Sequence, residues 1–98
     1  MKNRGPTFWS WSDAQLQATA HEEELDDGTK IDVQARISKT GGTQMFLGVY
    51  TEDGRIITEE IYDSLPGQTT SRAIVSGTQR ARAVAIGASE PLRTARHP

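Results

Sequence analysis

Three glycine-containing pairs constrain the fold more than any other feature of this sequence. They are Asp27-Gly28, Gly41-Gly42 and Asp53-Gly54. Such pairs tolerate the positive φ angles that two-residue hairpin turns require. The stretches between them alternate apolar and polar residues, as half-buried β-strands do. Residues 14–62 are therefore predicted to form four antiparallel strands joined by three tight turns.

Two-residue turns also predict the register of the sheet, because the residues flanking each turn must pair. This pairing gives three cross-strand rows, and alternation of side chains puts all three on one face. The rows are Ala20-Ala35-Gly48-Glu59, Ala18-Ile37-Phe46-Ile61 and Glu22-Val33-Tyr50-Ile57. The third strand, residues 43–51, is apolar on both faces, so Met45, Leu47 and Val49 are predicted to point to the back. Antiparallel sheets normally leave one face polar, so this back requires a cover.

A helix is predicted after the break at residues 63–67, from Thr69 or Thr70 to Ile86. Its inward stripe would be Ala73 or Ile74, Gly77, Ala81, Val84 and Ala85, at helical spacing. The middle of this stripe has small residues, and so does the cross-strand row Ala20-Ala35-Gly48. The helix and the sheet are therefore predicted to pack closely. The predicted class is α+β: a four-stranded antiparallel meander with one C-terminal helix packed on one face. One domain spans residues 7–88, between a disordered N-terminus, 1–6, and a disordered tail, 89–98.

The segment before the first turn allows two interpretations. Residues 12–15 resemble a capping box, whereas the alternation of Leu16, Ala18 and Ala20 with polar residues indicates a strand, which we favour. Upstream, Trp9 and Trp11 would point the same way from an extended segment. They either cover the sheet as a flap or anchor a partner.

Charge is unevenly distributed along the chain. Residues 1–65 carry 12 acidic and 6 basic side chains, and residues 66–98 carry 1 acidic and 5 basic. A basic segment of this kind either binds nucleic acid or complements the acidic sheet of the same molecule. The second interpretation is favoured because so few basic residues make a weak phosphate footprint. The acidic run of residues 22–27 is interpreted as a solvated edge strand.

No residue pattern points to catalysis, so we expect no enzyme activity, no catalytic residue, no metal and no cofactor. The chain has no cysteine, and phosphate-binding, nucleophile and metalloprotease signatures do not occur. His21, Glu23 and Asp32 could approach one another but lack a fourth ligand. Glu59 falls on the predicted core face, with Arg80 as a candidate partner. Without a signal-like or membrane-spanning run, a cytoplasmic bacterial-type protein is expected.

The predicted order of elements resembles two nucleic-acid-binding families. Four meander strands followed by a helix resemble the single-stranded-DNA-binding domain of a family of dimeric transcriptional coactivators. If residues 13–24 were helical, the order would resemble a double-stranded-RNA-binding domain, although Thr69-Thr70-Ser71-Arg72 replaces its lysine-rich helix start. Both resemblances concern element order and carry no functional residue to this chain.

The function expected from these features is a small non-catalytic protein-interaction module that forms a homodimer or binds another protein. Its expected partner-binding residues are Trp9, Trp11, Met45, Leu47, Val49, Ile56 and Tyr62. The alternative is a nucleic-acid-binding domain, in which helix arginines contact phosphates and tryptophans stack on bases. The arginines in question are Arg72, Arg80 and Arg82.

Overall fold

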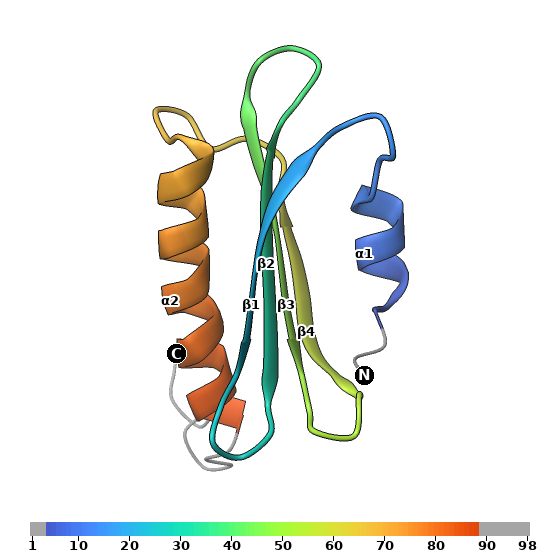
Figure 1. The fold of residues 1–98 in the computed structure, drawn as a ribbon, viewed down its shortest axis with the longest axis vertical. Coiled ribbons are helices and arrows are strands. Elements are labelled where there is room, and N and C mark those ends of the chain that lie inside the picture. Colours follow the sequence, from blue (N-terminus) through green and yellow to red (C-terminus); the bar gives the residue numbers. More distant parts are fainter. Residues whose placement is uncertain (1–3, 89–98) are drawn as a thin grey trace, which may run out of the picture.

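The computed structural model describes residues 4–88, which form a central sheet with one helix on each face (Figure 1). The strands are β1 (Ala18–Glu24), β2 (Lys30–Ile37), β3 (Thr43–Tyr50) and β4 (Ile56–Tyr62), and they pair antiparallel in the order β1-β2-β3-β4. The short helix α1 (Pro6–Trp11) lies on one face and the long helix α2 (Thr70–Ala88) on the other. The prediction of a four-stranded antiparallel sheet followed by a helix is confirmed, and residues 18–24 are a strand.

The three hairpin loops contain three residues each, not two. Backbone hydrogen bonds of 2.8 Å close them, from Leu25 N to Thr29 O, Ser38 N to Gly42 O and Thr51 N to Arg55 O. The last residue of each loop is a glycine in the left-handed region, at φ 88°, 93° and 92° for Gly28, Gly41 and Gly54. This is the three-residue hairpin, a type I turn followed by a left-handed residue. Gly42, which we predicted in the second loop, therefore lies outside it and pairs with Ser38.

Two of the three predicted registers are wrong, because the first loop has an extra residue and the second has an extra residue and also begins two residues earlier, at Lys39 instead of Gly41. Ala35 pairs with Thr19 on β1 and with Met45 on β3, offsets of one and three residues from the predicted partners. An odd offset turns a strand over, so β1 and β3 present the opposite faces from those predicted relative to β2, and β4 turns with β3: Tyr62 lies on the α2 side and Ile61 on the α1 side. Between β3 and β4, however, a bulge at Val49/Tyr50 absorbs the extra residue, and Gly48 pairs with Glu59 as predicted.

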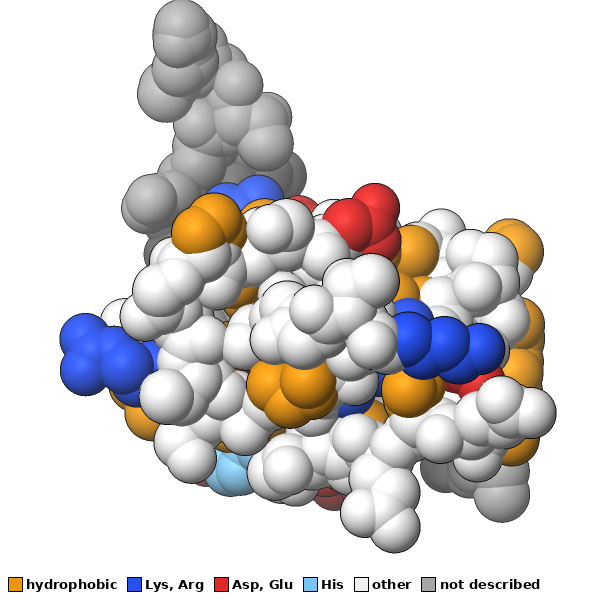
Figure 2. Space-filling model, turned by 90° about the horizontal axis from the view of Figure 1, so that it is seen from above, with side chains coloured by type: hydrophobic (Ala, Val, Ile, Leu, Met, Phe, Trp, Pro, Cys, Tyr) orange, Lys and Arg blue, Asp and Glu red, His pale blue; other side chains and the backbone are white. Residues whose placement is uncertain are grey.

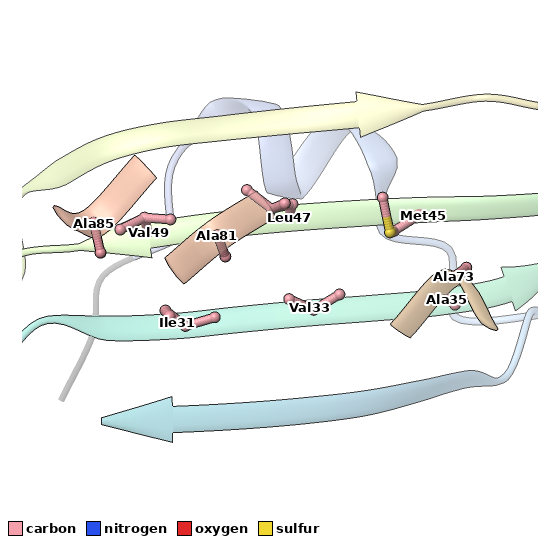
Figure 3. Packing of buried hydrophobic residues seen from close by; sticks show 9 residues of the cluster. All are labelled: Ile31, Val33, Ala35, Met45, Leu47, Val49, Ala73, Ala81 and Ala85. Carbon is pink, nitrogen blue, oxygen red and sulfur yellow. The ribbon is translucent and has the colours of Figure 1, made fainter. Parts of the chain in front are cut away.

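The main core lies between α2 and the two central strands (Figure 3). Thr69 caps this helix, since its Oγ1 accepts a hydrogen bond of 3.1 Å from Arg72 N. The predicted inward stripe is confirmed, with Ala73, Ala81 and Ala85 buried. It packs on residues from both strands: Ile31, Val33, Ala35, Met45, Leu47 and Val49. The face of β3 that we predicted to lie away from the helix is thus the face that α2 covers. The predicted row of small residues, Ala20, Ala35 and Gly48, does not form beneath the helix, because these residues are not paired with one another.

Gly77 lets α2 approach the sheet closely, as predicted, although against different neighbours. A Cβ atom at Gly77 would lie 2.5 Å from Met45 Sδ and 2.8 Å from Val33 Cγ1. Val33 is a stiff, fully buried side chain. A larger residue at position 77 therefore forces the helix away from the sheet.

We predict that Gly77→Leu destabilises the protein by about 1–3 kcal/mol, the usual cost of overpacking, even though leucine favours helices more than glycine does. The matched control is Gly87→Leu in the same helix, where, apart from the neighbouring residues and the helix's own backbone, no described atom lies within 4 Å of the added Cβ. Urea unfolding followed by circular dichroism measures both. Equal unfolding midpoints for the two variants would contradict the close packing at Gly77.

Candidate partner-binding surface

The helix α1 replaces the extended segment that we predicted for Thr7–Ser12. Helical geometry separates the two tryptophans: Trp11 is 5% exposed and Trp9 is 63% exposed. Pro6 stands in the first turn, where its fixed φ and missing N–H are tolerated. A helix of six residues is not stable on its own in water. Its stability must therefore come from the sheet.

Glu59 on β4 holds the N-terminal end of α1. Its carboxylate accepts hydrogen bonds from Gly5 N at 2.7 Å, Phe8 N at 3.3 Å and the Tyr50 hydroxyl at 2.8 Å. The first N–H groups of a helix have no partners within the helix, and they favour a nearby negative charge. Glu59 thus acts as a cap supplied by the sheet. The predicted pairing of Glu59 with Gly48 is confirmed, but no sequence pattern indicated this capping role. The predicted partner of Glu59, Arg80, binds Glu60 instead.

Arg36 on β2 holds the other end of α1. Its Nη1 donates a hydrogen bond of 2.6 Å to Trp11 O, one of the carbonyls left unpaired at the C-terminus of a helix. Its Nε donates to Gln44 Oε1 at 2.9 Å, and its guanidinium lies 3.8 Å from the centroid of the Trp11 ring. A positive charge at a helix C-terminus is favourable. No sequence pattern indicated this role of Arg36.

A partly buried ion pair also fastens the segment that precedes α1. Arg4 Nε donates to the carboxylate of Asp32 at 2.9 Å, and the Asp32 side chain is fully buried. The Arg4 guanidinium also lies 4.5 Å from the centroid of the Phe8 ring. Arg4 and Gly5 were expected in a disordered segment but contact the sheet; residues 1–3 lie outside the described residues.

Aromatic rings fill the space between α1 and the sheet. Phe8 and Trp11 contact Phe46 on β3, with ring centroids 5.0 and 5.8 Å apart, and Ile61 packs beside them. Tyr50 is fully buried next to this cluster. Burial, together with the hydrogen bond to Glu59, raises the pKa of Tyr50 well above its usual value. The aromatic cluster therefore shields the polar anchors of α1 from water in part, which lowers the local dielectric and strengthens them.

Trp9 is the exposed part of this otherwise fixed helix. Its ring meets Phe8 edge-to-face, with centroids 4.9 Å apart, and its Nε1 donates to Arg4 O at 3.2 Å. On the adjacent edge strand β4, Ile56 is 46% exposed. Seen end-on, hydrophobic side chains gather along the α1 side of the molecule (Figure 2, right). We call Trp9 and Ile56 the α1–β4 surface.

The structure divides the residues predicted to bind a partner. Trp9 and Ile56 are exposed, whereas Trp11 lies under α1. Met45, Leu47 and Val49 were predicted on the face away from α2, beneath a flap or a partner, and this placement is wrong. The hairpin loops turn that face of β3 toward α2, which buries all three side chains. Tyr62 is partly buried on the α2 side, where its hydroxyl donates to Glu60 Oε1 at 2.6 Å.

Two of the three arginines predicted for nucleic-acid binding are paired with the sheet. Arg80 reaches Glu60 on β4 at 3.0 and 3.2 Å, and Arg82 reaches Glu23 on β1 at 2.7 and 2.8 Å. Within residues 4–88, the Arg72 side chain forms no ion pair. Arg80 and Arg82 thus complement the acidic sheet, as the favoured interpretation of the charge distribution predicted.

These pairs shift the ionisation of their carboxylates. Hydrogen bonds from Arg82 and then His21 lower the pKa of Glu23 to about 2. Burial alone would raise the pKa of Glu60, but hydrogen bonds from Arg80 and Tyr62 outweigh it and lower the value.

The three residues considered as metal ligands do not converge. His21 Nε2 lies 3.1 Å from Glu23 Oε1 on the α2 face, whereas Asp32 binds Arg4 on the α1 face. Throughout residues 4–88, no group of three or more histidine, aspartate or glutamate side chains is arranged to hold a metal ion. Neither described helix is long and apolar enough to cross a membrane.

Comparison with known proteins adds no relative: no protein-family model, no curated protein and no solved structure matches this chain. The surface must therefore be interpreted from its own chemistry.

We predict that Glu59→Gln destabilises the protein by about 1–3 kcal/mol, because the charged acceptor that holds α1 is lost. The adjacent Glu60→Gln is the control on the opposite face. It removes an ion pair whose arginine is 54% exposed, so it should cost less than about 1 kcal/mol. Urea unfolding of both variants, followed by tryptophan fluorescence, measures the difference. A larger loss in Glu60→Gln would contradict the anchoring role of Glu59.

The lowered pKa of Glu23 predicts a pH dependence. The ionised carboxylate contributes stability that is fully present above pH 4.5, its ordinary pKa, and is lost as the pH falls toward about 2. In Glu23→Gln, the urea midpoint should therefore fall less steeply between these pH values than in the wild type. Glu24→Gln controls for the loss of one exposed carboxylate, and an identical slope in Glu23→Gln and wild type would disprove the linkage.

Proposed function

We propose that this chain is a small, non-catalytic, cytoplasmic protein-interaction module whose partner binds the α1–β4 surface. The observation that carries the proposal is an exposed tryptophan on a helix that the sheet clamps at both ends. Trp9 is 63% exposed, while Glu59 and Arg36 hold the ends of its helix.

A fixed, exposed tryptophan suits binding to another protein for two physical reasons. Tryptophan is enriched among the residues that contribute most to protein interfaces, because it buries a large area with few rotatable bonds. A helix that is already ordered also loses little conformational entropy on binding. Ile56, on the neighbouring edge strand, adds apolar surface beside backbone groups that have no further strand to pair with.

The polar groups beneath α1 support a binding role in preference to catalysis. Asp32, Tyr50 and Glu59 are buried or partly buried acidic groups on this face, and each is engaged in holding α1 or its leading segment. A general base needs room for a substrate within hydrogen-bond reach. Here the aromatic cluster of α1 occupies that position.

The alternative function, nucleic-acid binding, receives less support from the geometry. Phosphate contacts require basic side chains that are free to reach the backbone. Arg80 and Arg82 are held by carboxylates of the same chain. Residues 4–88 contain 12 acidic and 8 basic side chains, a net charge of -4, which repels phosphate.

Selection from a phage-displayed library of random peptides tests the proposal. Peptides enriched on the wild-type protein should bind Trp9→Ser at least about tenfold more weakly, the effect expected of an interface anchor. The matched control is Ile37→Ser, which removes an apolar residue that is 47% exposed outside the α1–β4 surface.

Circular dichroism spectra and urea midpoints must first show that Trp9→Ser and Ile37→Ser remain folded. Peptides that bind Trp9→Ser as tightly as the wild type would contradict the proposed surface. So would a loss of binding only in Ile37→Ser.

A further inference from the structure

The outward face of α2 carries two large apolar side chains that are more than half exposed. Val75 and Ile86 are 59% and 53% exposed. They belong to a row whose members are alternately three and four residues apart: Arg72, Val75, Gln79, Arg82 and Ile86. This spacing is that of the contact row of a coiled coil. The sequence of α2 also contains no acidic residue, which is unusual for a helix face that meets only water.

The middle of this row forms a ridge between two shallow grooves. One groove is lined on the N-terminal side by Gln68, Ser71, Arg72 and Ser76, and the other by His21, Ile74, Thr78 and Arg82. Val75 and Gln79 line both of them. Helices pack by fitting the ridge of one into the groove of the other. The shape of this surface therefore suits packing against a second helix.

We propose that a second copy of this chain packs on this face, with the two α2 helices antiparallel and a two-fold axis between Gln79 and Arg82. Counting outward from that axis, Val75 of each copy meets Ile86 of the other. Gln79 likewise meets Arg82. A two-fold interface must be complementary to itself. This row satisfies that condition, because the apolar side chains of Val75 and Ile86 face each other and the amide oxygen of Gln79, an acceptor, faces the guanidinium of Arg82, a donor.

The charge of Arg82 does not oppose this arrangement. Its Nε and Nη2 donate to Glu23 of the same chain, so each guanidinium near the axis has its positive charge compensated. These two bonds leave Nη1, which in the proposed dimer can donate to the amide oxygen of Gln79 in the second copy. The centre of the interface is thus polar but without repulsion between like charges.

Charge complementarity at the ends of the row selects the antiparallel orientation. Beside Ile86 lies an acidic groove lined by Glu23, Glu24, Leu25, Asp26, Asp27 and Ala85. In the antiparallel pair, the N-terminus of the second α2 reaches this end, bringing Arg72, which is exposed and forms no ion pair within residues 4–88. The positive end of the helix dipole lies there too. A parallel pair would instead place Arg72 beside Arg72.

Sedimentation equilibrium of the full chain tests the self-association. The wild type should dimerise, and Val75→Glu and Ile86→Glu should each raise the dimer dissociation constant by roughly tenfold or more, as expected when a central apolar contact is replaced by charge. Both residues are exposed in one copy, so the variants should stay folded by circular dichroism. Trp9→Ser, on the opposite face, is the matched control and should dimerise normally. A wild type that is monomeric up to its solubility limit would overturn the proposal.

A charge exchange tests the predicted end contacts. Arg72→Glu and Glu24→Arg should each weaken the dimer, because each creates a pair of like charges. The double variant should recover wild-type affinity, since the opposite charges are exchanged and restored. Weakening in the double variant equal to the sum of the two single effects would refute the contact between Arg72 and the acidic groove.

Cysteine cross-linking tests the orientation, and the absence of native cysteine makes it specific. A mixture of Val75→Cys and Ile86→Cys should be linked efficiently by a short bis-maleimide. Val75→Cys alone should not be linked, because positions 75 and 86 are about 16 Å apart along a helix that rises about 1.5 Å per residue. Efficient linking of Val75→Cys to itself would show a parallel pair and reject the proposed axis.

Discussion

The length of three hairpin loops governs the architecture of this protein. Each loop has one residue more than the shortest hairpin allows, and in each a glycine at φ near 90° closes the loop. Because side chains alternate along a strand, the odd offsets turn β1, β3 and β4 over relative to β2, compared with the arrangement that two-residue loops would give. Met45, Leu47 and Val49 therefore face α2, while Phe46 and Tyr50 face α1. Strand β3 is buried on both sides, and each helix needs the residues that its face of β3 provides.

The two faces of the sheet hold their helices by different means. On the α2 face, small side chains allow close approach, and burial of apolar surface supplies the stability. On the α1 face, the helix is too short to be stable by itself, and charged groups of the sheet bind its two ends. The aromatic cluster beneath α1 partly shields these bonds from water and so strengthens them. Trp9 is held in a fixed position as a consequence.

The outer surfaces of the two helices lie on opposite sides of the molecule (Figure 1). Binding of a partner at the α1–β4 surface therefore leaves the outer face of α2 uncovered, and self-association through α2 leaves Trp9 accessible. Arg80 and Arg82 extend from α2 to the two edge strands and neutralise Glu60 and Glu23. These ion pairs remove charge from the flanks of α2 and leave its outer row mostly uncharged.

The sequence by itself determined the strands, the three reversals, the long helix and its small inward stripe, because these follow from local periodicity and from the backbone freedom of glycine. It also indicated that the basic C-terminal segment would complement the acidic sheet, but it did not identify the pairs Arg80–Glu60 and Arg82–Glu23. Only the tertiary structure decided which face of β3 meets α2, because a single loop residue reverses a strand and the two faces of β3 are equally apolar. It alone decided that Pro6–Trp11 is helical, since the groups that cap it, Glu59 and Arg36, come from strands distant in sequence. Local patterns carry no information about such long-range contacts, and these contacts separate the exposed Trp9 from the buried Trp11.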